Sequence, residues 1–104
     1  MTETEFLTMA DDCLRQVEET FERAFENDEL DVDCKRSGNV LEIEFVNNGS
    51  KIIVNSQAAM QEMWLAARSG GFHYRHDGQV WRNTRDGSEF FSTLSAIASE
   101  QGKA

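Results

Sequence analysis

The strongest constraint on the fold of this chain is a change in the spacing of its apolar residues. From residue 4 to about residue 27 they recur every three or four positions, which is the period of an amphipathic helix. From residue 29 onward apolar and acidic residues alternate, which is the period of a strand with one solvent-facing side. A chain with both periods must pair a helix with a sheet through their apolar faces. The apolar helical positions are Phe6, Met9, Ala10, Cys13, Leu14, Val17, Phe21, Ala24 and Phe25.

Short turn sequences divide the segment that follows. Alternation predicts strands over residues 29–34 and 41–45, and the apolar run within 51–57 predicts a third. The turns between them, at 37–39 and 47–50, are rich in Asn and Gly. These residues accept positive φ, so they favour tight hairpins.

The last part of the chain predicts another hairpin and a second helix. Residues 72–82 form a hairpin that turns at Asp77-Gly78, whereas residues 60–66 fit either a strand or a helix from composition alone. A second amphipathic helix follows, with Ser88 or Asp86 as its N-cap and Gly102 at its end.

These elements predict one domain over residues 1–104, in the order helix, five or six antiparallel strands, helix. Short hairpins favour antiparallel pairing, and two amphipathic helices need an apolar surface to cover. We therefore expect an α+β two-layer sandwich, with both helices packed on one face of a five- to six-stranded antiparallel sheet.

Negative charge is concentrated in the first third of the chain. Residues 1–33 hold twelve Asp and Glu against two Arg, a net charge of −10, whereas residues 34–104 have a net charge of +1. The acidic balance argues against nucleic-acid binding, and no apolar run is long enough to cross a membrane. The N-terminus lacks the basic and apolar regions of a signal peptide, so we expect a cytoplasmic protein whose two cysteines, Cys13 and Cys34, are reduced core thiols.

Two columns of charge run along the predicted first helix at four-residue spacing. One column alternates in sign, so it neutralises itself; the other is purely acidic and continues into the acidic residues of the first strand. A purely acidic band fits three interpretations: a solubilising face, a surface for a basic protein, or weak, exchangeable, several-site binding of hard cations by carboxylate oxygens. The alternating column is Asp11, Arg15, Glu19 and Arg23; the acidic one is Glu18, Glu22 and Glu26.

The second half of the chain carries a more specific pattern. It consists of Asn48 to Gln57 (NGSKIIVNSQ), Met63-Trp64-Leu65-Ala66 and Gly70-Gly71-Phe72-His73-Tyr74. With the acidic first helix, these segments resemble the signature of the frataxin family, and its bacterial members are the nearest match. The chain departs from the family pattern at Ala59, where a proline is frequent, and in a slightly longer spacing around residues 26–28.

The resemblance implies a strand over residues 60–66 and a role in iron–sulfur cluster assembly. It implies weak, exchangeable binding of Fe²⁺ and Fe³⁺, and docking on the cysteine desulfurase and the iron–sulfur scaffold protein as a regulator or an iron supplier. The sequence has no nucleophile-elbow, Gly-rich phosphate-loop or metalloprotease motif, so we expect no enzymatic activity, and we expect a mainly monomeric protein. The alternatives are a ferroxidase or iron-storage oligomer assembled by iron, and an acidic interaction module without metal. The implied metal ligands, which we call the acidic ridge, are Glu18, Glu19, Glu22, Glu26, Asp28, Glu29, Asp31 and Asp33. The implied partner-binding residues are Glu18, Glu19, Glu22, Asn55, Gln57 and Trp64.

The side on which the remaining aromatic and histidine residues lie follows from the alternation of side chains along a strand. Met63 and Leu65 flank Trp64, so Trp64 faces away from the core, either as an exposed binding anchor or half-covered by a neighbour. His73 and His76 are three residues apart, so on a strand they face opposite sides and do not form a metal pair. Trp81 is expected to pack structurally.

Overall fold

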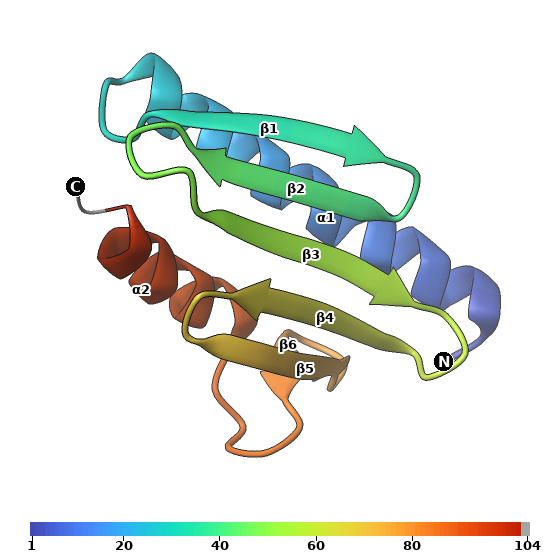
Figure 1. The fold of residues 1–104 in the computed structure, drawn as a ribbon. Coiled ribbons are helices and arrows are strands. Elements are labelled where there is room, and N and C mark those ends of the chain that lie inside the picture. The colour runs from blue at the N-terminus through green and yellow to red at the C-terminus, as the bar shows by residue number, and fades with distance from the viewer. Residues whose placement is uncertain (103–104) are drawn as a thin grey trace.

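The computed structural model describes residues 1–102 and contains two helices on one side of a six-stranded antiparallel sheet (Figure 1). The strands lie in sequence order across the sheet, so every sheet neighbour is also a chain neighbour. This confirms the expected α+β two-layer sandwich, including a strand in the ambiguous 60–66 stretch. The elements are α1 (Glu3–Glu26), β1 (Val32–Ser37), β2 (Val40–Phe45), β3 (Lys51–Gln57), β4 (Glu62–Ala67), β5 (Gly70–His76), β6 (Trp81–Asn83) and α2 (Phe90–Gln101).

Helix α1 begins at a capping box. The Thr2 side chain accepts a hydrogen bond from the Glu5 amide at 3.1 Å, and the Glu5 carboxylate accepts one from the Thr2 amide at 2.9 Å. Two amide groups that the helix leaves without partners are thereby satisfied. The helix ends at Glu26 with Asn27 as its C-cap, and Asp28 follows with a positive φ of 58°.

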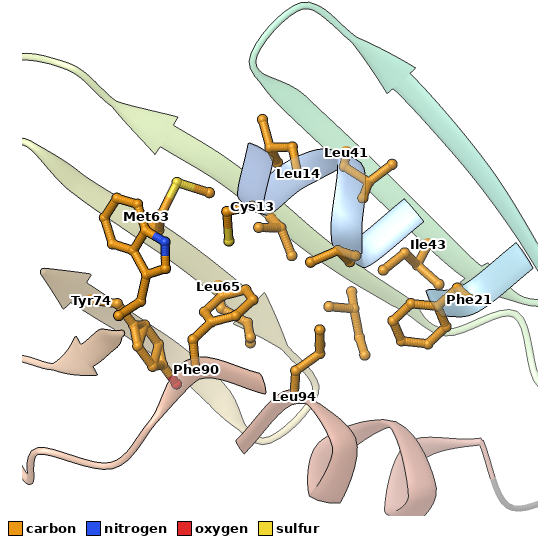
Figure 2. Packing of buried hydrophobic residues seen from close by; sticks show 14 of the residues in the cluster. Cys13, Leu14, Phe21, Leu41, Ile43, Met63, Leu65, Tyr74, Phe90 and Leu94 are labelled. Atoms are coloured by element: carbon orange, nitrogen blue, oxygen red, sulfur yellow. The ribbon is translucent and has the colours of Figure 1, made fainter. Parts of the chain in front are cut away.

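The core lies between the sheet and the helices. The apolar stripe of α1 meets inward-facing strand residues, and Figure 2 shows Leu14 and Phe21 among Leu41 and Ile43. Leu41 and Ile43 are 0% exposed. Burying each such side chain contributes about 1.5–3 kcal/mol. Two predicted stripe residues near the end of α1 are not part of the core: Ala24 is half-buried, and Phe25 is 51% exposed.

Two elements in the C-terminal half, β6 and α2, begin at other residues than the sequence predicts. In both cases side-chain carboxylates accept hydrogen bonds from backbone amides of the preceding turn or the first helical turn. Asp77 accepts hydrogen bonds from the amides of Gln79 and Val80, so an Asp-centred turn replaces the start of the predicted strand, and β6 begins at Trp81. The other difference concerns the cap of α2.

The N-cap of α2 is Glu89, not Ser88 or Asp86. The Glu89 carboxylate accepts hydrogen bonds from the amides of Phe91 and Ser92 at 2.7 and 2.9 Å. Asp86 instead accepts hydrogen bonds from the amide and hydroxyl of Ser88, which closes the preceding turn. Gly102 ends α2 as predicted.

The C-terminal end of α2 is tied to the sheet by Gln101, which is 4% exposed. Its side-chain amide donates to the Lys51 carbonyl at 2.9 Å and to the Ser50 hydroxyl at 3.1 Å, and its oxygen accepts from the Arg68 amide at 3.0 Å. Asn48 adds a hydrogen bond to the Gln101 carbonyl. The β2–β3 and β4–β5 turns therefore both anchor this helix.

None of the helices within residues 1–102 has both the length and the apolar character needed to cross a membrane.

Candidate functional site

The helical part of the acidic ridge lies beside the edge strand β1. Helix α1 packs against β1, which is the first strand of the sheet. Burial, followed by the charges of Glu22, Glu18 and Asp33, raises the pKa of the Cys34 thiol in β1 to about 11. The charges of three ridge carboxylates, two on α1 and one on β1, thus reach one half-buried thiol, so the helical and strand parts of the ridge lie at the same edge of the sheet.

The connection between α1 and β1 carries the next ridge residues on a fixed backbone. The amides of Asp28 and Glu29 donate to carbonyls in the last turn of α1, at 3.1 and 2.9 Å. The Asp31 carbonyl accepts from the Val46 amide at 2.9 Å, which holds the start of β1 against the end of β2. The side chains of all three residues are exposed, so their carboxylates face solvent from an ordered chain.

No ridge carboxylate forms an ion pair within residues 1–102. Five other carboxylates in the same part of the chain do. Those are Asp11 with Arg36, Asp12 with Arg15, Glu42 with Lys51, Glu62 with Arg75, and Asp77 with Arg82. The ridge is therefore the largest group of carboxylates without an ion pair in this part of the chain.

The alternating column of α1 is not neutralised as the sequence predicted. Asp11 pairs with Arg36 on β1, and Arg15 pairs with Asp12 one turn earlier in the helix. Glu19 has no ion pair within residues 1–102, so it joins the uncompensated ridge. The prediction failed because Arg36 is distant in sequence and reaches α1 only through the fold.

The ridge does not form a closed metal cage. Within residues 1–102, no three His, Cys, Asp or Glu groups converge closely enough to hold a metal ion. Exposed carboxylates with this spread can supply one or two oxygen ligands each while water completes the coordination of a hard cation. We therefore expect such a surface to bind cations weakly at several positions, and not at one defined site.

Glu44 belongs beside the ridge, although sequence analysis did not include it. Asp33 on β1 stands directly opposite Glu44 on β2, and neither has an ion pair within residues 1–102. The alternation of residues 41–45 predicts that Glu44 faces solvent. It does not predict that Glu44 lies opposite Asp33, because that depends on the register between β1 and β2. Two carboxylates opposite each other on neighbouring strands are destabilising, which adds to the charge density at this edge.

The side of the sheet that faces away from the helices, on which Asp33 and Glu44 also lie, brings the predicted docking residues together. Asn55 stands opposite Trp64, and Trp64 stands opposite His73, so one row of side chains crosses β3, β4 and β5. Gln57 lies in the next row, opposite Glu62. We call Asn55, Gln57 and Trp64 the docking face.

The orientation of Trp64 follows the predicted parity. Its neighbours Met63 and Leu65 lie in the core at 0% and 1% exposure, while Trp64 lies on the far side and is half-buried. Its ring stacks on His73, with centroids 4.3 Å apart and planes 7° from parallel. His76 packs edge-on against Trp81, so the two histidines do lie apart.

A buried carboxylate supports the docking face, and sequence analysis missed it. Glu62 Oε1 accepts a hydrogen bond from Trp64 Nε1 at 2.9 Å, and Oε2 accepts one from Arg75 Nε at 2.9 Å. His73 Nδ1 lies 3.5 Å from Oε1. Burial opposes ionisation, but the two hydrogen bonds and the charges of Arg75 and His73 lower the pKa of Glu62. The signal in the sequence was parity, since Glu62 and Trp64 are two residues apart.

Both cysteines are free thiols, as expected. Cys13 is buried in the core, where burial, followed by the charge of Glu89, raises the pKa of its thiol to about 12. Cys34 is only half-buried, so it is less enclosed than predicted.

Comparison with known proteins gives a consistent result. The model of a family described as a frataxin-like domain matches residues 1–104. The chain is 59% identical over 102 residues to the iron–sulfur cluster assembly protein CyaY of Herminiimonas arsenicoxydans, covering 98% of this chain and 91% of that protein. It is 50% identical over 104 residues to the protein of the same name from Cupriavidus necator, covering 100% and 93%.

Solved structures agree with the fold. Frataxin from Psychromonas ingrahamii superposes with a TM-score of 0.79 at 35% identity, covering 97% of this chain and 91% of that chain. Trimeric frataxin from the yeast Saccharomyces cerevisiae, complexed with ferrous iron, superposes with a TM-score of 0.76 at 23% identity, covering 89% and 84%. At that identity, the yeast protein supports the architecture alone.

Proposed function

The chain belongs to the frataxin-like domain family, and on this premise we propose that it is an iron-binding protein of iron–sulfur cluster assembly. It binds Fe²⁺ or Fe³⁺ weakly and reversibly on the acidic ridge. It docks on the cysteine desulfurase and its scaffold protein, and it regulates them or supplies them with iron. The curated relatives are named for iron–sulfur cluster assembly, and iron is cargo in this proposal.

The observation that supports the proposal most is the contrast in ion pairing. The eight ridge carboxylates are unpaired within residues 1–102, whereas acidic residues on the same helix, Asp11 and Asp12, have arginine partners. Like charges four residues apart on a helix destabilise it by a few tenths of a kcal/mol per pair. A folded protein gains nothing from this repulsion, so a cation or basic surface that neutralises it is the best explanation.

The chemistry of the ridge fits iron as a weakly held cargo. Carboxylate oxygens are hard ligands that suit small, highly charged cations. The ridge offers them on an open surface without a cage, so affinity is low and exchange is fast. Both properties suit a protein that passes its ion to a partner.

Docking uses two surfaces with different roles. Glu18, Glu19 and Glu22 attract a basic partner surface and raise the rate of encounter, because exposed charges act at long range. Asn55, Gln57 and Trp64 supply shape and hydrogen bonds at short range. A half-buried tryptophan at the centre of such a contact is the kind of residue that dominates binding energy.

The test compares two double variants that remove the same charge from the same helix. E18Q/E22Q removes two unpaired ridge carboxylates, and D11N/D12N removes two paired ones. Both are titrated with Fe²⁺ under anaerobic conditions and followed by ¹⁵N NMR, with Ca²⁺ as a second ion. We expect E18Q/E22Q to lose signal broadening over residues 18–33 and to bind the desulfurase less tightly, whereas D11N/D12N behaves like the parent protein.

Stability separates function from folding in the same pair of variants. E18Q/E22Q relieves repulsion, so its free energy of unfolding should rise by a few tenths of a kcal/mol or stay unchanged. D11N/D12N breaks two surface ion pairs and should lose about 0.2–1 kcal/mol for each. If E18Q/E22Q binds iron and the desulfurase like the parent protein, the ridge assignment is wrong.

Separate measurements, with Fe²⁺ added to aerated protein and with partner binding followed at increasing salt, distinguish the alternatives. A ferroxidase or iron-storage oligomer would consume O₂ catalytically with Fe²⁺ and grow beyond a monomer in light scattering. An acidic interaction module without metal would bind its partner in a strongly salt-dependent way and would be indifferent to iron.

A further inference from the structure

Glu62 is a buried carboxylate on the side of the sheet that faces away from both helices. It is 4% exposed, whereas the side chains of its neighbours His73 and Arg75 are 49% and 61% exposed. Burying a carboxylate is unfavourable unless hydrogen bonds and opposite charge compensate for lost hydration. Its partners therefore explain why the residue is tolerated there.

Those partners are all surface groups. One carboxylate oxygen holds the Trp64 indole N–H and lies near His73, and the other holds Arg75 Nε. A well-packed apolar residue is commonly as stabilising as a buried ion pair, so fold stability alone does not require a carboxylate at this position. What the carboxylate adds is a fixed orientation for three side chains around the docking face.

We propose that Glu62 is a positioning residue for the docking face: it holds the Trp64 indole flat on His73 and the Arg75 guanidinium beside them, so that a partner meets a preformed aromatic plate with one cation at its rim. This inference rests on the proposed function, because it assumes that Trp64 contacts the partner. Glu62 itself acts through its neighbours, since it is almost fully covered.

Preorganisation is the physical gain. A tryptophan that is free to change rotamer loses that freedom on binding, whereas one already fixed does not, so fixing it in advance improves affinity. Two independent contacts fix Trp64 here, the hydrogen bond to Glu62 and the near-parallel stack on His73 at 4.3 Å.

The cation at the rim defines the chemistry of the partner. Arg75 has one hydrogen bond within residues 1–102, from Nε to Glu62, and its side chain is 61% exposed, so its two terminal nitrogens are available to an acceptor on a partner. A guanidinium held at Nε presents these nitrogens to a carboxylate. The partner surface should therefore place an acidic side chain next to a flat or apolar group.

The test uses three variants of the full chain. E62A removes the acceptor, and E62Q keeps an oxygen that accepts the indole N–H but removes the charge. E42Q is the matched control. Glu42, on β2, lies on the same face of the sheet and also forms an ion pair, with 3.2 Å between its Oε1 and Lys51 Nζ. Each variant is examined for hydrogen exchange of the Trp64 indole N–H by NMR, and for binding to the desulfurase–scaffold complex.

In E62A the indole N–H should exchange at least about tenfold faster, and binding should weaken on the order of tenfold. In E62Q the indole should stay protected while binding weakens less, and E42Q should match the parent protein in both. If E62A does not fold, E62Q and R75Q carry the test, since both leave an acceptor for the indole. In R75Q the indole should stay protected and binding should lose part of its salt dependence.

Two results would overturn the proposal. One is an unchanged indole exchange rate in E62A, and the other is faster exchange with binding equal to E42Q. W64A shows where the failure lies. If W64A weakens binding and E62A does not, only the positioning role is wrong; if W64A binds like the parent protein, the docking part of the proposed function fails with it.

Discussion

Replacing Gln101 by alanine should destabilise the protein far more than its place near the end of the chain suggests. The side chain makes three hydrogen bonds, to the Arg68 amide, the Lys51 carbonyl and the Ser50 hydroxyl, at 2.9–3.1 Å. Each such bond contributes about 0.5–1.5 kcal/mol net, and a buried partner left alone adds to the loss. We expect the free energy of unfolding to fall by about 2–4 kcal/mol.

Thermal and urea unfolding measure this loss directly. For a domain of about 100 residues, 1 kcal/mol corresponds to about 4–8 °C in Tm, so Gln101→Ala should lower Tm by roughly 10–25 °C. Ser99→Ala is the control, because Ser99 is exposed in the same last turn of α2 and should stay within about 0.5 kcal/mol.

A second substitution at the same position tests the mechanism. In Gln101→Glu the ionised carboxylate cannot donate to the Lys51 carbonyl, so the loss at pH 7 should equal or exceed that of the alanine variant. Below the pKa of the new side chain one donor returns, and part of the stability should return with it. A loss under about 0.5 kcal/mol in Gln101→Ala would refute the reasoning, because it would mean that water replaces all three bonds.

Three other substitutions should give clear outcomes. Gly102→Ala should destabilise the end of α2 in urea unfolding, since an added Cβ would lie 2.9 Å from the Ala98 carbonyl oxygen; wild-type stability would contradict this. Tyr74→Phe should change the unfolding free energy by less than about 1 kcal/mol, because within residues 1–102 no group meets hydrogen-bond geometry with the buried hydroxyl; a larger loss would mean that it bonds to Thr93 or Asn83, whose side chains act on its pKa. Cys13 should make the protein lose stability as pH rises from about 9 to about 12, since the unfolded thiol ionises first; the slope is about 1.4 kcal/mol per pH unit. Cys13→Ala should reduce the slope of the unfolding free energy, measured by urea unfolding between pH 9 and 10.5, by about that amount, and the slope due to Cys34, whose pKa is raised to about 11, should remain; an unchanged slope would exclude Cys13 as a source.

Periodicity predicted most of the architecture because each element buries one face. The stripe of α1, the alternation of β2 and the parity of Trp64 all depend on burial, which the order of apolar residues encodes directly. Residues 60–66 could not be assigned in this way, because residues 63–67 are all apolar, although Trp64 and Ala66 point away from the core. Only the resemblance to a known family identified that strand.

The parts of the site that sequence did not predict depend on pairs that are distant along the chain. Arg36 and Asp11 are separated by 25 residues, and Arg75 and Glu62 by 13. No local pattern specifies such a pair, because it requires the sheet register and the packing of α1. The predicted N-cap of α2 was wrong for a local reason. Asp86, Ser88 and Glu89 all carry an acceptor near the start of the helix; Asp86 closes the preceding turn with Ser88, and Glu89 is left to cap the helix. The metal and partner roles of the ridge and docking face stay predictions.

The position of the ridge beside β1 has a consequence for self-association. As the first strand of an open sheet, β1 presents unpaired backbone groups to solvent, and such an edge can pair with the edge of another molecule. Asp31 and Asp33, with the acidic side of α1 behind them, keep two such edges apart by repulsion. A cation that neutralises these carboxylates removes the same barrier. If the ridge binds metal as proposed, one set of side chains governs both metal loading and the tendency of the chain to form strand-to-strand assemblies.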